Sequence, residues 1–431
     1  MSGNDKQSRF RPAPRTHATS QSNPASQPGL SPVSEATQPR RFRIVATLGI
    51  TQTLAWASSY YLAAILADPI ACELGMTSTG VFAPFSAALV IAALLGPRVG
   101  RTIDHFGGRE VLAASNVLFA AGLLLLAAAH SVLVIWLGWL MLGFGMGMGL
   151  YDAAFATLGR HYGDKARSAI TGITLIAGFA STVGWPLTAL GVETIGWRYT
   201  CGGWALAHLC LGLPLNLFGL PRPLGLGLAI SDAAKPHIPM DRTMWLLGFA
   251  FAAGWVVSTA MAAHLPRILE AAGATTAQAV AAGALIGPAQ VAARLMEAGV
   301  LSRYHPLLSA RLCLLGHPLG AALLVWGGAW FAAPFTLLHG AGNGILTIAR
   351  GTVPLSIFGP DNYGYRLGLL GAPARLAQAG APLMFGLLVE RYGAGALFVS
   401  CGFCLAGFIA LLLVKASAKR QGSVSGGDEK P

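Results

Sequence analysis

Charged residues are scarce in this chain. Only 11% of its 431 residues are Asp, Glu, Lys or Arg, whereas soluble domains carry roughly 25%. Hydrophobic residues make up 54%, and apolar runs of about 20 residues, long enough to cross a bilayer core, recur along nearly the whole length. These two features exclude an ordinary soluble protein and predict an all-α polytopic membrane protein.

Sequence signatures of enzymes are also absent. The chain has no His-Glu-x-x-His motif, no Gly-x-Ser-x-Gly motif and no phosphate loop ending in Gly-Lys-Ser/Thr. We therefore expect no enzyme activity, no cofactor, no metal site and no direct use of ATP. The six cysteines, Cys401 and Cys404 included, mostly fall in apolar segments and are expected to pack as small core residues rather than to bind metal.

The net charge of +12 could suggest a nucleic-acid partner, but the basic residues lie in short loops and tails. That placement indicates contact with the anionic face of a lipid bilayer and no nucleic acid. Residues 1–39 are rich in Ser, Gln, Pro and Thr and lack the apolar stretch of a signal peptide. With the basic residues up to Arg43, they are expected to form a disordered cytoplasmic tail.

Twelve membrane spans are predicted, in two sets of six. The spans are 44–66, 80–99, 111–130, 133–158, 168–190, 200–219, 243–264, 277–297, 309–330, 332–358, 366–388 and 394–415. The longest polar connection, 220–242, separates the two sets, as in transporters built from two bundled halves. The predicted parts are therefore a tail (1–43), an N-terminal six-helix bundle (44–219), a cytoplasmic linker (220–242), a C-terminal six-helix bundle (243–415) and a C-terminal tail (416–431).

Basic residues gather on one side of the predicted spans. On that side lie Arg98, Arg101, Arg109, Arg160, Lys165, Arg167, Arg222, Lys235, Arg242, Arg303, Arg311, Arg366, Lys415, Lys419 and Arg420, against Arg198, Arg267 and Arg391 on the other. The positive-inside rule then predicts a multi-pass protein of the inner (plasma) membrane with both termini in the cytoplasm.

Three sequence echoes relate the two halves. Gly143-x-Gly145-x-Gly147 matches Gly340-x-Gly342-x-Gly344, and Trp56-x-x-Ser59 matches Trp255-x-x-Ser258. Gly100-Arg101-x-x-Asp104 has a degraded copy in Ala293-Arg294-x-x-Glu297. Echoes at corresponding spans indicate two pseudo-symmetric repeats.

The stretch 96–109 is interpreted as a tight loop between the second and third spans, rich in glycine and arginine. It resembles the signature loop of the major facilitator superfamily, Gly-x-x-x-Asp-Arg-x-Gly-Arg-Arg, with Gly100, Asp104, Gly107 and Arg109 in matching positions. The resemblance implies two six-helix bundles around a central cavity that is lined by the first, fourth, seventh and tenth helices. It also implies alternating access, in which this loop latches the cytoplasmic side.

Two further resemblances bear on the substrate. Arg294, with Gln290 one turn before it, lies at a position that resembles the substrate arginine of monocarboxylate-porter carriers. The stretch Asp68-Pro69-x-x-x-Glu73-Leu-Gly75 is also similar to that branch. Those carriers usually have an acid at the position of Gln290. The arginine and glutamine typical of the fourth helix of drug-proton antiporters are replaced by Trp139 and Leu142, which argues against that branch.

Charged residues inside membrane spans usually face a cavity or a partner. Asp152 and Arg350 fall at similar depths in the fourth and tenth spans; they are either a proton or substrate site or a structural ion pair with the signature loop. Arg375 lies roughly 14 Å into the eleventh span at 1.5 Å per residue, with Gln378 one turn on. It either binds an anionic substrate or coupling ion or pairs with carbonyl groups or Asp152.

Polar and aromatic residues complete the candidate set. His339 and Asn343 lie one turn apart on one helix face; the imidazole is either a carrier of a coupling proton or a packing residue. Trp56, Ser59, Tyr60, Trp255 and Ser258 offer aromatic walls with hydroxyl groups, although interfacial anchoring is the alternative for Tyr60.

These observations predict a monomeric secondary transporter of a small molecule, coupled to protons, with an organic anion or monocarboxylate-like substrate. Arg350 and Arg375 would bind or balance the anion, and Asp152, followed by His339, would take up the proton. The alternatives are an exporter of amphipathic or toxic compounds and a non-transporting membrane sensor. The sequence itself specifies neither the substrate nor the direction of transport.

Overall fold

The computed structural model describes residues 38–221 and 238–415, which are helical and contain no strand. The predicted linker and the two tails lie largely outside the described residues. The first half has helices α1 (Gln38–Ala57), α2 (Leu62–Leu74), α3 (Ser78–Phe106), α4 (Arg109–Ala127), α5 (Val132–Gly149), α6 (Tyr151–Tyr162), α7 (Arg167–Ala177), α8 (Ala180–Ile195), α9 (Trp197–Ala207) and α10 (Leu213–Gly219). The second half has α11 (Arg242–Ala271), α12 (Thr276–Ala284), α13 (Ile286–Gly299), α14 (Pro306–Gly327), α15 (Ala332–Phe358), α16 (Tyr363–Tyr392) and α17 (Ala396–Leu413).

Within the described residues, eight helical stretches are long and apolar enough to cross a membrane. Three of them, of 64, 53 and 51 residues, each have the length of two crossings, since one crossing takes about 20 residues. The all-α polytopic class is therefore confirmed. The full count of twelve spans and the proposed domain boundaries stay predictions.

Four predicted spans are not continuous helices. The chain breaks at 58–61, at Leu150, at 178–179 and at Leu285. Pro288 in the first turn of α13 explains the last break, because a proline lacks the N–H that would continue the preceding helix. The break at Leu150, whose backbone is extended (φ −85°, ψ −173°), places Asp152 in the first turn of α6.

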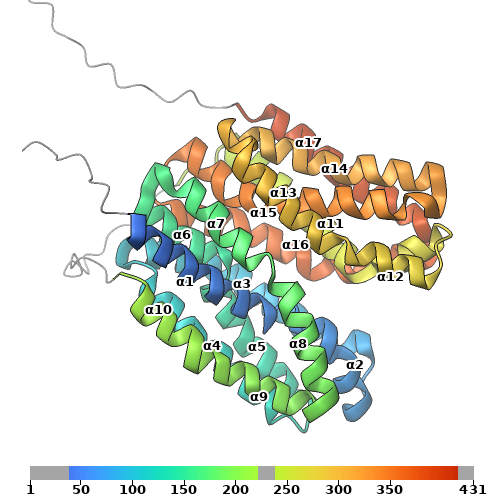
Figure 1. Ribbon diagram of the computed structural model, residues 1–431, viewed down its shortest axis with the longest axis horizontal. Coiled ribbons are helices and arrows are strands. Elements are labelled where there is room, and N and C mark those ends of the chain that lie inside the picture. The colour runs from blue at the N-terminus through green and yellow to red at the C-terminus, as the bar shows by residue number, and fades with distance from the viewer. Residues whose placement is uncertain (1–37, 222–237, 416–431) are drawn as a thin grey trace, which may run out of the picture. The chain divides into compact units, whose positions relative to one another are not determined.

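From Arg40 onward the described residues cluster as one compact unit. α4 packs against α5 and α9 in the first half, and α14 packs against α15 and α17 in the second (Figure 1). The most extensive contact in the whole unit joins α3 of the first half to α16 of the second.

Glycines make the contact between α3 and α16 possible. A Cβ atom built on Gly368 would lie 2.5 Å from the backbone of Gly96, and one on Gly100 would overlap the backbone of Gly364. Small residues of this kind allow helix backbones to approach closely in membranes. The interpretation of 96–109 as a loop is wrong, because α3 continues as a helix to Phe106. Only Gly107 (φ +90°) and Gly108 form the turn.

Glu73, one of the two acids in the 68–75 stretch, has structural partners. The Glu73 carboxylate accepts a hydrogen bond from Trp197 Nε1 at 2.7 Å and pairs with Arg198 Nη1 at 2.5 Å. The hydrogen bond from Trp197, followed by that from Arg198, lowers the pKa of Glu73. In this structure, Glu73 fixes α2 to the start of α9.

Candidate functional site

Three buried charged side chains meet where helices of the two halves face each other. Arg350 of α15 approaches Asp152 of α6, with 2.5 Å between Nη2 and Oδ2. Arg375 of α16 pairs with the same carboxylate oxygen. All three residues are buried, so the cluster of two cations and one anion holds one uncompensated positive charge.

Local backbone features admit this cluster. Asp152 lies in the first turn of α6, where the free N–H groups and the helix dipole stabilise a negative charge. Gly371 of α16 leaves the space for the guanidinium and the carboxylate: a Cβ there would lie 2.6 Å from Arg350 Nη2 and 2.9 Å from Asp152 Oδ2. Asp152 Oδ1 is buried and has no hydrogen-bond partner among the described residues.

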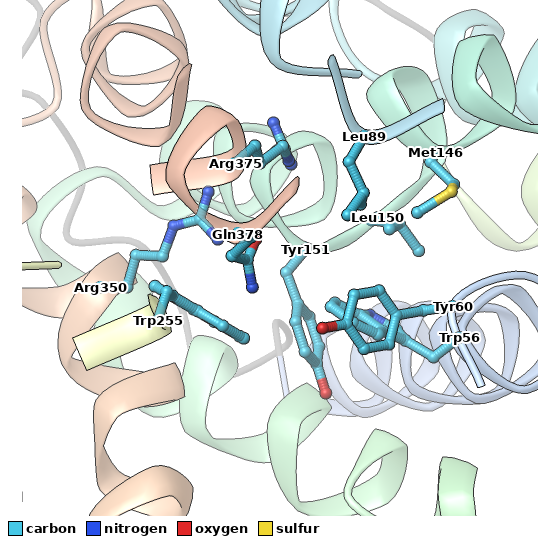
Figure 2. A pocket seen from close by; sticks show the side chains of 10 residues that line it. All are labelled: Trp56, Tyr60, Leu89, Met146, Leu150, Tyr151, Trp255, Arg350, Arg375 and Gln378. Carbon is cyan, nitrogen blue, oxygen red and sulfur yellow. The ribbon is translucent and has the colours of Figure 1, made fainter. Parts of the chain in front are cut away.

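Aromatic side chains enclose a central cavity next to this cluster. Its lining comprises Trp56, Tyr60, Leu89, Met146, Leu150, Tyr151, Trp255, Arg350, Arg375 and Gln378. Figure 2 shows Arg350, Arg375, Gln378 and Trp255 on one side of Tyr151, and Trp56, Tyr60, Leu89, Met146 and Leu150 on the other. The free space is close to that of one water molecule, so the cavity is closed in this conformation.

A further buried cation, Arg294 of α13, lies close to the same aromatic cluster. Its side chain is only 3% exposed, and its one hydrogen bond joins Nη2 to Gln290 Oε1 at 3.3 Å. Nε and Nη1 have no partner among residues 38–221 and 238–415. Tyr61 and Tyr151 lie within its electrostatic reach, and the guanidinium packs against Gly178 at the break between α7 and α8, where a Cβ would overlap it.

Unpartnered donors outnumber unpartnered acceptors around the cavity. Trp56 Nε1, Trp255 Nε1 and the two Arg294 nitrogens are buried donors without a partner, whereas Asp152 Oδ1 is the one buried acceptor of these residues without one. Leaving buried donors unpaired costs about 1–3 kcal/mol each, and more for charged groups. This arrangement favours a ligand that supplies negative charge and hydrogen-bond acceptors.

The structure separates the predicted site residues into two groups. Tyr60 and Gln378 line the central cavity and are linked to each other by Thr259. The Thr259 hydroxyl lies 3.3 Å from Tyr60 Oη and accepts a hydrogen bond from Gln378 Nε2 at 3.1 Å. Ser59 is not in the cavity lining, because its hydroxyl donates to the Ala55 carbonyl at 2.5 Å.

The other group lies inside the second half. His339, Asn343 and Ser258 line a second cavity, where Ser258 Oγ donates to Asn343 Oδ1 at 2.8 Å. Among the described residues, no cluster of three or more His, Cys, Asp or Glu side chains could hold a metal ion.

Asp104 and Arg109 of the signature motif make contacts in two different places. Asp104 accepts from the backbone N–H groups of Gly364 and Tyr365, each at 2.8 Å, at the start of α16. Arg109 instead donates to the Leu217 carbonyl at 2.7 Å, within the first half. Only Asp104 of this pair ties the two halves together.

The echo of Asp104 in the second half makes a corresponding contact. Glu297 of α13 pairs with Arg167 at the start of α7, with 2.9 Å between Oε1 and Nη2, and accepts from Ser309 Oγ at 2.7 Å. Each half thus places an acid near the start of a helix of the other half.

Sequence reasoning missed several residues of these sites. Tyr151, which lines the cavity within electrostatic reach of Arg294, gave no signal beyond its place beside Asp152. Gly178 and Gly371 gave none, because a glycine that admits a guanidinium resembles any other glycine in an apolar helix. His317 could have been found by the argument applied to His339, since it is also a polar residue inside a predicted span.

Comparisons with known proteins complete this description. The family profile described as Major Facilitator Superfamily matches residues 48–338. A relative from Thermoproteus tenax, described as an uncharacterized 38 kDa protein in the 23S RNA operon, is 25% identical over 82% of this chain and 90% of its own.

Two solved structures have a similar fold. The proton:xylose symporter XylE, solved with 6-bromo-6-deoxy-D-glucose, aligns with TM-score 0.69 and 14% identity, over 87% of this chain and 95% of its own. The human organic anion transporter MFSD10 (TETRAN) aligns with TM-score 0.66 and 18% identity, over 87% of this chain and its full length.

Proposed function

The chain belongs to the Major Facilitator Superfamily and is a secondary transporter in the membrane, and from this premise we propose that it carries a small organic anion together with protons. The observation that carries the proposal is the excess of buried positive charge. Arg350 and Arg375 pair with one carboxylate, Asp152. Arg294 is a third buried guanidinium, within electrostatic reach of Tyr151 in the cavity lining, so these four groups carry two more positive than negative charges.

Arg294 is the primary anion-binding residue in this proposal. Its Nε and Nη1 have no partner among the described residues, so a carboxylate can pair with either edge of the guanidinium, Nε with Nη2 or Nη1 with Nη2. A buried ion without a partner is strongly unfavourable, so a bound anion would gain the full benefit of pairing with it. The indole N–H groups of Trp56 and Trp255, also unpartnered, supply further donors in the adjacent cavity.

Arg350 and Arg375 form the second part of the site. Asp152 balances one of these charges while the cavity is closed, and an incoming anion competes with it for the guanidinium groups. The ion cluster also links α6 of one half to α15 and α16 of the other, so its rearrangement changes the contact between the halves. This links substrate binding to alternating access.

The contacts of Asp104 and Glu297 are the proposed latches of that motion. We place both on the cytoplasmic side of the inner membrane, together with both chain termini, on the basis of the distribution of basic residues. The two structural neighbours, a proton:xylose symporter and an organic anion transporter, are compatible with a proton-coupled anion carrier.

Replacing Asp104 with Asn is expected to slow transport while membrane insertion stays intact. The carboxylate accepts from two backbone N–H groups at a helix start, and the neutral amide loses the charge and one of these acceptors, at about 1 kcal/mol for each hydrogen bond. Initial rates of uptake into proteoliposomes should fall severalfold at equal protein content. Thr102→Ala, on the exposed end of α3, is the control, and unchanged kinetics in Asp104→Asn would remove this latch from the account.

Anion binding can be tested without transport. A panel of small carboxylates should raise the thermal stability of the purified protein, by about 2.7 kcal/mol at 100 times the dissociation constant, whereas the matching neutral amides should not. Equal stabilisation by acid and amide would contradict an anion site.

Export of an amphipathic or toxic compound is the second candidate. It is favoured by one observation, the aromatic wall formed by Trp56, Tyr60, Tyr151 and Trp255. An exporter of hydrophobic cations would have to place its substrate beside two uncompensated positive charges, which argues for the anion.

A further inference from the structure

A second cavity lies inside the C-terminal half, between α11, α14, α15 and α17. It is lined by Gly254, Val257, Ser258, Cys313, Leu314, His317, His339, Gly342, Asn343, Leu346 and Cys404. The lining contains two imidazoles and no Asp, Glu, Lys or Arg. The polar side chains of this second cavity make no hydrogen bond or ion pair with the central ion cluster in the described residues.

The two imidazoles are joined to each other. His317 Nδ1 lies 3.1 Å from His339 Nδ1, and His317 Nε2 lies 2.8 Å from Ser400 Oγ. The Ser400 hydroxyl donates to the Leu397 carbonyl at 2.9 Å, so its single proton is used there and its oxygen accepts from His317 Nε2–H. Since a neutral imidazole carries one N–H, His317 Nδ1 is then the acceptor and His339 Nδ1–H the donor.

This assignment leaves the lone pair of His339 Nε2 free. Nε2 makes no hydrogen bond with any described residue, and the His339 side chain lines the second cavity. A proton can be added there without breaking any bond of the chain from His339 through His317 to Ser400. The pair therefore takes up one proton as imidazole becomes imidazolium and returns it from the same atom.

The buried histidine of the first half provides a contrast. His208 Nε2 lies 2.7 Å from Ser58 Oγ and His208 Nδ1 lies 2.9 Å from Asn116 Oδ1, and Phe119 stacks on the ring. Both ring nitrogens of His208 thus have hydrogen-bond partners. His339, in contrast, lines a cavity and keeps one nitrogen without a partner among the described residues.

The groups around the pair do not fix its charge. The other titratable side chains of the lining are the thiols of Cys313 on α14 and Cys404 on α17, while α11 contributes Ser258 and α15 contributes Asn343. Glu297 of α13 acts electrostatically on Cys313.

The second cavity is close to the central one. Ser258 and Trp255 lie one turn apart on α11, and they line the second and the central cavity respectively. On α15, His339 and Arg350 are separated by roughly 16 Å at 1.5 Å per residue. At an effective dielectric constant of about 20, an anion and an imidazolium at this distance strengthen each other's binding roughly fivefold.

We infer that His317 and His339 form the proton-binding site that couples proton movement to anion transport. The inference rests on the proposed function for its coupling role, and on the hydrogen-bond chain for the proton site itself. His339 Nε2 accepts one proton from water on one side of the membrane and releases it to water on the other. The anion in the central site supplies the compensating negative charge while the proton is bound.

The test compares His339→Gln and His317→Gln with the matched control His208→Gln. Potentiometric titration of the purified proteins in nanodiscs should show one bound proton fewer than wild type for the first two variants, and no change for the control. In proteoliposomes, His339→Gln should still exchange labelled for unlabelled carboxylate. The carboxylate accumulation driven by a pH gradient should be at least tenfold lower than in wild type. If His317→Gln does not fold, His339→Gln decides alone, because it leaves the His317–Ser400 bond in place.

Other outcomes separate the two proposals. If His339→Gln binds as many protons as wild type, or accumulates carboxylate as wild type does, the inference is overturned. If wild type moves no carboxylate but the one-proton difference is present, the proposed substrate is wrong and the proton site stands. Loss of the proton in His208→Gln as well would overturn the distinction between the two histidines.

Discussion

Replacing Arg294 with Gln should abolish carboxylate uptake while making the protein more stable. Uptake is lost because truncating one partner of a buried charge pair costs about 2–5 kcal/mol, which is roughly 30-fold to several thousandfold in affinity at 1.4 kcal/mol per factor of ten. The gain follows because Arg294 is buried with two unpartnered nitrogens. Removing that uncompensated charge should raise the free energy of unfolding by about 1 to 3 kcal/mol.

Uptake into proteoliposomes and thermal unfolding in detergent measure the two effects. Arg391→Gln is the matched control, since Arg391 is exposed at the end of α16 and should affect neither quantity. A structural arginine would show the opposite stability effect. Lower stability of Arg294→Gln together with normal uptake would therefore exclude Arg294 as the anion-binding residue.

Replacing Asp152 with Asn should destabilise the protein by about 3 to 5 kcal/mol, the cost of leaving buried charges without their partner. Two guanidinium groups share this one carboxylate, so the variant buries two cations side by side. Adding Arg350→Gln removes one cation and restores the net charge of the wild-type cluster. The double variant should therefore recover most of the lost stability, although not transport.

A double-mutant cycle on thermal unfolding measures this coupling. The two substitutions should be strongly non-additive, as expected for residues in one ion network. A small carboxylate should also stabilise Asp152→Asn more than wild type, because it takes the place of the missing negative charge. Additive effects of Asp152→Asn and Arg350→Gln would show that the cluster is not an electrostatic unit.

Much of the fold could be predicted from the sequence, because a bilayer imposes long apolar runs that are visible without a structure. The breaks at Leu150 and at 178–179 could not, since they lie inside uniformly apolar stretches. Their positions depend on packing: the first places Asp152 in a new helix start, and the second makes room for Arg294. The signature motif was recognised, but its conformation depends on the close approach of α3 to α16.

The candidate site was predicted in part. The presence of charged residues inside apolar spans identified Asp152, Arg350 and Arg375 as candidates. Which of them form ion pairs depends on how helices that are distant in the sequence pack together. The sequence placed Asp152 and Arg350 at similar depths and gave Asp152 as one alternative partner of Arg375. The structure shows that both arginines bind the same carboxylate oxygen. The partner of His339 is another histidine on α14, a contact that no spacing along the chain encodes.

The central claim is that the excess of buried positive charge serves to carry an anion across the membrane. Its most direct test is uptake of a panel of small radiolabelled carboxylates into energised proteoliposomes, with a proton-sensitive dye inside. The account predicts that at least one carboxylate accumulates, that protons enter with it, and that Arg294→Gln loses both signals. Movement of a hydrophobic cation or a neutral compound, with no carboxylate transported, would contradict it.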